Sequence, residues 1–262
     1  MVDRPVLFLH ERPERPCGFG FRPADIRSGK MITFEHVSKR YPGGNQALAD
    51  VSFHLDPGEM VFLTGHSGAG KSTLLRLILM LEQATRGQVV VNGKNLSRTP
   101  MSQAPRIRQG MGMIFQDHKL LRNKTVSDNV ALPLLIAGLR YNEIRRRVRA
   151  ALDKVGLLGK EKSWPMALSG GEQQRVGVAR AIVGMPPVLL ADEPTGNLDP
   201  DLSADLFGLF RQLNQLGVTV LIASHDLDLI RRMGDRVLVL QNGHLIDDIP
   251  PHPRSSQRQT DQ

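Results

Sequence analysis

The segment that most restricts the fold of this chain is a glycine-rich loop between two apolar segments. Residues 65–73 read Gly-His-Ser-Gly-Ala-Gly-Lys-Ser-Thr, after a short buried-strand pattern at 59–64 and before a helical pattern at 72–81. Glycines let such a loop turn its amide groups toward a phosphate, and the helix that follows adds a partial positive charge at its N-terminus. The sequence therefore predicts an α/β fold that binds a nucleotide.

The residue types in this loop predict how it holds the nucleotide. The backbone of residues 65–70 is expected to surround the phosphates, Lys71 to reach the β- and γ-phosphates, and the Ser72 hydroxyl to coordinate Mg²⁺. The predicted cofactors are therefore ATP and Mg²⁺. The predicted cofactor-binding residues of the loop are Gly65, His66, Ser67, Gly68, Ala69, Gly70, Lys71, Ser72 and Thr73.

Two further apolar strands lead into side chains suited to phosphoryl transfer. Asp192 and Glu193 follow the apolar residues 188–191, and His225 follows the apolar run 218–223. Carboxylates at the carboxyl ends of strands in an α/β sheet face the ligand crevice. We predict that Asp192 holds Mg²⁺ and that Glu193 polarises the water that attacks the γ-phosphate. His225 is predicted to keep Glu193 and that water in line.

Gln116 ends another predicted strand, at 111–115, and leads into a helical segment at about 117–174. Its amide oxygen is a predicted Mg²⁺ ligand with a part in catalysis. Residues 116–133 are expected to couple the nucleotide site to a partner. This segment contains four apolar residues that either the partner or the segment's own core could use. They are Leu120, Leu121, Val126 and Val130.

Residues 168–174, Leu-Ser-Gly-Gly-Glu-Gln-Gln, lie between the phosphate loop and the acidic strand end. Their serine and paired glycines suit a second phosphate cradle, one that cannot reach the first cradle within a single subunit. These motifs, in this order, resemble the family of ATP-binding-cassette (ABC) ATPases over about residues 31–245. That fold has a mixed-sheet core lobe, an antiparallel β part and a helical subdomain.

The resemblance implies further contacts. Residues 65–73 match the Walker A loop, Gln116 the Q-loop, 168–174 the signature, 188–193 the Walker B strand, 196–199 the D-loop and His225 the switch histidine. It implies that Tyr41 stacks on adenine and that two subunits form an ATP-dependent homodimer. The residues then expected at the facing subunit's nucleotide are Ser169, Gly170, Gly171, Glu172 and Asp199.

A narrower resemblance is to the FtsE family of bacterial cell-division ATPases. It rests on the amino-acid sequence of residues 31–39, 62–70, 112–118, 144–148 and 151–158, with His66 and Ala69 as the most distinctive positions. The chain departs from that family at Met80 and Ala84, where glycine and proline are more usual. This resemblance implies an FtsX-like integral membrane partner, a peripheral place on the cytoplasmic face of the bacterial inner membrane, and control of septal peptidoglycan hydrolysis. Lipoprotein-release and macrolide-export ATPases share most of these sequence features, and membership of one of those groups is the alternative to the cell-division assignment.

The 262 residues contain one phosphate loop and one signature, which predicts a single ATPase domain at 31–249. Residues 1–30 are expected to be a disordered extension or a mis-assigned start, and residues 250–262 a disordered tail. The only cysteine, Cys17, lies outside the predicted core, which fits a reducing compartment. The longest uncharged apolar stretch, 130–139, is too short to cross a membrane.

The basic composition, with a formal net charge of +8, raises the possibility of nucleic-acid binding. Fewer than one hundred residues separate Lys71 from Ser169, which leaves no room for the coiled-coil arms of ABC ATPases that act on DNA. We therefore predict no nucleic-acid partner. Half of the net charge lies in residues 140–149, beside an apolar helical stripe that begins at Ile144 and Val148. This arginine run is either a solvated helix face or a contact for anionic headgroups or an acidic partner.

Overall fold

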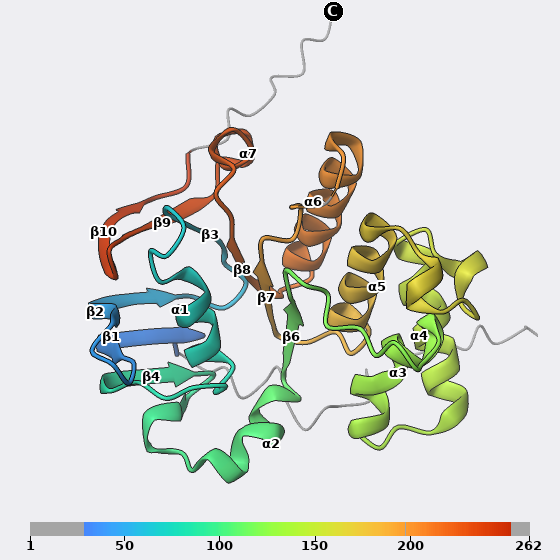
Figure 1. Cartoon of the computed structure of the whole chain (residues 1–262), viewed down its shortest axis with the longest axis horizontal. Coiled ribbons are helices and arrows are strands. Elements are labelled where there is room, and N and C mark those ends of the chain that lie inside the picture. Colours follow the sequence, from blue (N-terminus) through green and yellow to red (C-terminus); the bar gives the residue numbers. More distant parts are fainter. Residues whose placement is uncertain (1–28, 197, 253–262) are drawn as a thin grey trace, which may run out of the picture.

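The computed structural model describes residues 29–196 and 198–252, in which two sheets and seven α-helices form an α/β domain (Figure 1). The larger sheet has the strand order β10-β9-β3-β8-β7-β6, and its strands from β9 to β6 run parallel. Only β10 is antiparallel to its neighbour. The strands of this larger sheet are β3 (Met60–Thr64), β6 (Met111–Ile114), β7 (Val188–Asp192), β8 (Thr219–Ala223), β9 (Arg236–Gln241) and β10 (His244–Ile249).

The second sheet is antiparallel, with the order β2-β1-β4-β5. Its strands are β1 (Ile32–Arg40), β2 (Gln46–Leu55), β4 (Arg86–Val91) and β5 (Lys94–Asn95). Tight turns at 92–93 and 242–243 connect β4 to β5 and β9 to β10, and the asparagine and the glycine of each turn have positive φ. Such conformations favour Asn-Gly at two-residue hairpins. An Asn-Gly pair is therefore the local sequence signal for each of these hairpins, and the mixed fold class predicted from the sequence is confirmed.

The larger sheet separates two hydrophobic cores. Alternate residues of β7 point to opposite faces, so Leu189 and Ala191 join one core while Val188 and Leu190 join the other. The second core contains the antiparallel sheet and α1 (Lys71–Ile78). The first core holds the helices on the other face (Figure 1). They are α3 (Val126–Ile136), α4 (Tyr141–Lys154), α5 (Gly170–Ile182), α6 (Pro200–Gln215) and α7 (Leu227–Met233), while α2 (Ala104–Arg108) precedes β6.

The helical segment confirms the predicted apolar stripe of α4 and shows which apolar residues of 116–133 belong to the domain's own core. The apolar stripe of α4 is buried, from Ile144 and Val148 to Leu152. Val126 and Val130 are fully buried in the core, because they lie on the inner face of α3 against α4 and α5. They are therefore not available to a partner, whereas Leu121 is exposed. Short 3₁₀ turns at Leu158–Lys160 and Pro165–Ala167 connect α4 to α5.

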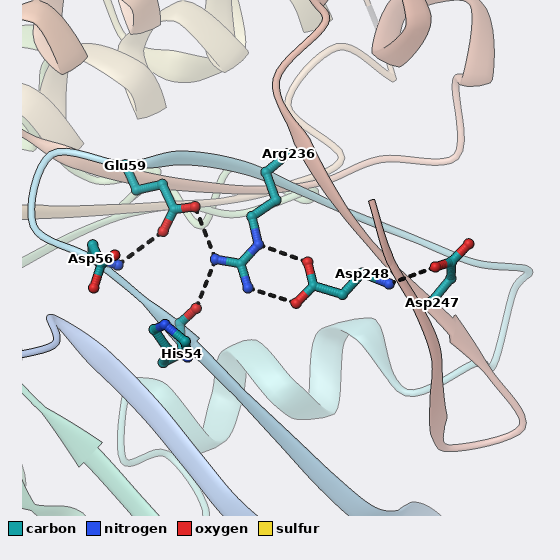
Figure 2. Close-up of polar contacts among 6 residues, drawn as sticks. All are labelled: His54, Asp56, Glu59, Arg236, Asp247 and Asp248. Atoms are coloured by element: carbon teal, nitrogen blue, oxygen red, sulfur yellow. Dashed lines mark hydrogen bonds and ion pairs between the residues drawn. The ribbon is translucent and has the colours of Figure 1, made fainter. Parts of the chain in front are cut away.

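One arginine connects the two sheets at the end of β3 that lies away from the phosphate loop (Figure 2). The Arg236 guanidinium donates to both carboxylate oxygens of Asp248, at 2.7 and 2.6 Å. It also donates to Glu59 and to the carbonyl oxygen of His54, each at 2.9 Å. Since these partners come from β2, β10 and the turn before β3, a single planar donor group fixes three segments.

The predicted extension and tail fall almost wholly outside the described residues, and Cys17 lies outside them too. Within residues 29–252, position 197 apart, no helix is long and apolar enough to cross a bilayer.

Candidate active site

Four neighbouring parallel strands place the predicted site residues along one edge of the larger sheet. In the spatial order β3, β8, β7, β6, these strands run into the loop 65–70, His225, Glu193 and Gln116. Their register is tight, because Ala223 of β8 pairs with Leu63 on one side and with Asp192 on the other. Segments separated by more than one hundred residues of sequence therefore meet at this edge.

The phosphate loop depends on glycine at two close backbone contacts. A Cβ on Gly65 would lie 2.2 Å from the carbonyl oxygen of Leu240, and one on Gly70 would lie 2.6 Å from that of Ala47. Both glycines also have positive φ, which side chains disfavour. The loop is thereby held against β9 and β2, and α1 begins directly after it at Lys71. His66, Ser67, Gly68 and Ser72 are exposed, so the outer side of the loop is open to a ligand.

Lys71 lies at the centre of this edge. Its buried side chain donates to the carbonyl oxygens of Gly65 at 2.6 Å and His66 at 3.3 Å. The same ammonium nitrogen is 3.9 Å from a carboxylate oxygen of Glu193. A cation enclosed by loop carbonyls and facing a carboxylate is suited to a strongly charged phosphate ligand.

Glu193 has a strained backbone and two charged neighbours. Its φ is +48°, a sparsely populated value for a residue with a side chain, and its N–H donates to the carbonyl oxygen of Ala223 at 2.9 Å. One carboxylate oxygen faces Lys71, while the other is 2.8 Å from Nδ1 of His225. His225 is 73% exposed, whereas the Glu193 side chain is largely buried. The pair can orient a water between the sheet edge and the solvent.

Asp192 lies at the last position of β7 and is directed toward α1. Burial raises the pKa of this carboxyl, and a hydrogen bond with Ser72 and the charge of Lys71 oppose that shift while Glu193 adds to it. A carboxylate and a hydroxyl side by side provide the hard oxygen ligands that Mg²⁺ prefers. The donor set present at Asp192 and Ser72 therefore fits Mg²⁺, and Gln116 is exposed at the end of the neighbouring strand β6.

Tyr41 lies beside the phosphate loop, and its hydroxyl makes contacts within the chain. The hydroxyl donates to Glu82 at 3.0 Å and lies 3.3 Å from Oγ1 of Thr73, a buried residue of α1. The ammonium of Lys39 is 5.1 Å from the centre of the Tyr41 ring. These contacts fix the ring near the N-terminus of α1.

The signature segment forms the N-terminus of α5, away from the phosphate loop. The Ser169 hydroxyl accepts from the N–H of Glu172 at 3.3 Å, and the Glu172 carboxylate accepts from the N–H of Ser169 at 3.0 Å, which makes a capping box. Lys160 also binds Glu172, and these two contacts lower the pKa of this carboxyl. A Cβ placed on Gly170 would meet no atom within 4 Å, so the surface of the segment is open at this residue.

No hydrogen bond or ion pair joins residues 168–174 to residues 65–73 in the described part of the chain. Asp199, in turn, caps α6 by accepting from the N–H of Leu202 at 2.9 Å. The structure thus brings together Lys71, Ser72, Asp192, Glu193 and His225. It leaves the signature residues and Asp199 outside that cluster.

Comparison with known proteins decides the family. The family profile described as ABC transporter matches residues 48–196, which is more than half of the chain. The chain is a member of the ABC transporter family. It is 60% identical over 215 residues to the cell division ATP-binding protein FtsE of Escherichia coli strain K12, across 82% of this chain and 97% of that protein. It is 43% identical over 218 residues to FtsE of Bacillus subtilis strain 168, across 83% and 96% of the two chains.

Solved structures of ABC cassettes have the same fold. A dimeric post-hydrolysis state of the ATP-binding cassette MJ0796, bound to ADP and Pi, superposes with a TM-score of 0.81 at 32% identity. The match covers 85% of this chain and all of that one. A further structure, cbiO1 from Clostridium perfringens, has a TM-score of 0.76 at 29% identity, over 86% of this chain and 90% of the other. This ABC chain is an ATP-binding, ATP-hydrolysing protein of the FtsE type.

Sequence reasoning missed a polar connection inside this ABC domain. The buried Gln174 of the signature donates to the carbonyl oxygen of Pro194 at 2.8 Å, and its amide oxygen pairs with Nδ1 of His118. Gln174 therefore connects α5 to the residue after Glu193 and to the loop after Gln116. One signal could have revealed it: Gln174 shares the helical spacing of Val178 and Ala181, which predicts an inward-facing side chain.

Proposed function

We propose that this chain is the ATPase subunit of an FtsE-type cell-division complex, in which an FtsX-like integral membrane protein is the partner and septal peptidoglycan hydrolysis is the controlled process. The observation that carries the catalytic part is the position of Glu193, with one oxygen 2.8 Å from His225 and the other 3.9 Å from Lys71. The identity of 60% to a cell-division ATP-binding protein supports the complex. The chain would then act at the cytoplasmic face of the inner membrane.

In this proposal the site residues have distinct roles. Lys71 and the loop 65–73 bind the phosphates, Tyr41 lies against the base, and Glu193 and His225 orient the attacking water. Orienting this water requires little rearrangement, because the Glu193 backbone N–H is already held by the Ala223 carbonyl oxygen and the Glu193 carboxylate by the histidine. Mg²⁺ would be held by Ser72, Asp192 and Gln116, and when bound it neutralises charge on the phosphates.

The signature would act on the nucleotide of a second subunit. Ser169, Gly170, Gly171 and Glu172 begin a helix that packs on the face of the sheet opposite to α1, so they are directed away from their own phosphate loop. An ATP-dependent homodimer, with Asp199 near the contact, would bring each signature to the facing loop. The dimeric form of the related cassette MJ0796 supports this arrangement.

The partner would dock in a cavity of about 220 Å³ between β6 and the helical segment. Its apolar lining includes Leu79, Met111, Phe115 and Pro133. Phe115 directly precedes Gln116, so a helix seated there would contact the strand that carries a predicted site residue. The helical subdomain, at about 117–174, would transmit movement from the nucleotide site to the membrane partner.

The decisive experiment compares Glu193→Gln with wild type and with Lys71→Ala. Glu193→Gln should lower the ATPase rate by roughly 10²- to 10⁴-fold and retain ATP, which is the loss expected for a group that positions or deprotonates water. Light scattering should show an ATP-dependent dimer for Glu193→Gln and none for Lys71→Ala. Hydrolysis by Glu193→Gln at the wild-type rate would remove the role proposed for Glu193.

The partner is tested separately by affinity capture from native membranes with Glu193→Gln and ATP, followed by mass spectrometry. Recovery of an FtsX-like protein supports the cell-division complex. Recovery of a lipoprotein-release or macrolide-export permease instead would reassign the chain to transport and leave its ATPase chemistry unchanged. Lys71→Ala, captured in parallel, identifies proteins that bind without ATP.

A further inference from the structure

Three large apolar or aromatic side chains are exposed within the short stretch of chain where α3 ends and α4 begins. Leu135 and Ile136, at the end of α3, are 55% and 65% exposed, and Tyr141, the first residue of α4, is 76% exposed. The preceding residue, Leu134, is fully buried, so the core ends abruptly at this point. We name Leu135, Ile136, Arg140 and Tyr141 the helix corner. Aliphatic side chains gathered at a surface indicate a contact that the isolated domain does not make.

The arginines around the helix corner fall into two classes. Arg147 is bound to Glu143 at 2.6 Å, and Arg149 is bound to both carboxylate oxygens of Glu161 at 2.9 Å. Arg140, Arg145 and Arg146 are exposed, and no acidic side chain of residues 29–196 or 198–252 pairs with them. The positive charge of the second class is therefore uncompensated.

The charged and apolar groups are placed to act together. Arg140 directly precedes Tyr141, and Arg145 lies one helical turn after it, so these residues project near one another at the start of α4. Arginine stems can lie along an apolar surface while the guanidinium remains in the polar layer. Aliphatic groups that enter a surface, next to free guanidinium groups, match the layered chemistry of a lipid bilayer.

We infer that the helix corner, with Arg145 and Arg146, binds the anionic headgroups of a lipid membrane surface. Leu135 and Ile136 enter the boundary between headgroups and acyl chains, Tyr141 lies at the level of the headgroups, and the three arginines bind lipid phosphates. A single-stranded nucleic acid would instead require several aromatic faces for stacking, and a single tyrosine is present here.

This inference rests on the proposed function only for the location of the chain near a membrane. Pro133 lines the cavity proposed for the membrane partner, and Leu135 follows it by two residues, so both surfaces lie on α3. Lipid binding is nevertheless a property of this chain alone. A vesicle assay without the partner therefore separates failure of this inference from failure of the proposed complex.

The test is flotation of the full chain with vesicles of phosphatidylcholine containing phosphatidylglycerol, against vesicles of phosphatidylcholine alone. We expect binding to the anionic vesicles that weakens with added salt. Arg145→Gln with Arg146→Gln should lower the partition coefficient roughly thirtyfold, because each basic residue at an anionic surface contributes about a fivefold factor. The matched control, Arg231→Gln with Arg232→Gln, makes the same charge change on exposed residues of α7 and should bind like wild type.

A second variant, Ile136→Ser, tests the apolar part without changing charge. It should weaken vesicle binding while the ATPase rate and the melting temperature stay at wild-type values, because Ile136 is exposed and is not one of the site residues. The inference is overturned if the wild-type chain does not float with anionic vesicles, or if neutral vesicles bind it equally. Equal loss of binding in the α7 control would also overturn it, since net charge alone would then explain the effect.

Discussion

Replacing Gln174 by leucine should destabilise the domain and slow hydrolysis while leaving ATP affinity unchanged. The side chain is 2% exposed, and leucine has a similar size but no polar atoms. The Pro194 carbonyl oxygen, at 2.8 Å from Nε2, would lose this donor in a buried place, at a cost of about 1–3 kcal/mol. His118 is only half-buried, so its ring nitrogen can turn to water. The expected loss of unfolding free energy is therefore about 1–3 kcal/mol in total.

For a domain of this size, each kcal/mol lowers the melting temperature by about 2–4 °C. Hydrolysis should fall by up to about a hundredfold, because Pro194 directly follows Glu193 and a small displacement of the water is costly. Calorimetry, nucleotide titration and an ATPase assay measure the three quantities. The control is Gln173→Leu, which removes only a half-buried bond to the Leu168 carbonyl oxygen at 3.2 Å and should cost about 1 kcal/mol or less. If both variants behave alike in stability and rate, Gln174 does not position the catalytic segment.

Asp192→Asn should raise the unfolding free energy at neutral pH, because burial raises the pKa of this carboxyl and its ionised form destabilises the folded state. This penalty is complete above the pKa of the folded state and absent below the pKa of the unfolded state, so the gain in unfolding free energy should shrink as the pH falls between these two values. Urea unfolding at neutral and acid pH measures this gain. An equal gain at both pH values would contradict a raised pKa at Asp192. Gly65→Ala should cost more than Gly68→Ala in urea unfolding. Both glycines have positive φ, at about 1–2 kcal/mol for a side chain, but only Gly65 would also place Cβ against a backbone oxygen, at 2.2 Å, whereas Gly68 has free space. Equal losses of unfolding free energy would mean that the backbone at Leu240 shifts to make room for the Cβ of residue 65.

Much of the site could be predicted because its parts are short and local. The loop 65–73 is recognisable as one continuous motif, and the hairpins at 92–93 and 242–243 each follow from a single Asn-Gly pair. Strand ends were also predictable, since Glu193 and His225 each follow an unbroken apolar run. The sequence could not provide the strand order, because hydrophobic runs do not state which strands are neighbours. Without it, the distance between Glu193 and His225 was undetermined.

The sequence alone also could not predict side-chain partners that depend on tertiary packing. Val126 and Leu121 look equally suited to a partner when only the sequence is read, and only the position of α3 against α5 separates the buried one from the exposed one. The same is true of the arginines of α4. Glu161 neutralises Arg149 from a turn twelve residues away, so the free charge at Arg145 becomes visible only when that turn is placed.

The two hydrophobic cores provide a physical reason for a second subunit in the proposed mechanism. The phosphate loop leads into α1, which packs in one core, while the signature begins α5, which packs in the other, with the sheet between them. A β-sheet buried on both faces keeps such helices on opposite sides, so one chain cannot direct both segments at a single phosphate without breaking a core. Two copies related by a twofold axis can do so, because the same surface then faces itself and each signature meets the other copy's loop. In the proposed mechanism, hydrolysis would therefore depend on association, because the site of one chain is incomplete without the signature of the other.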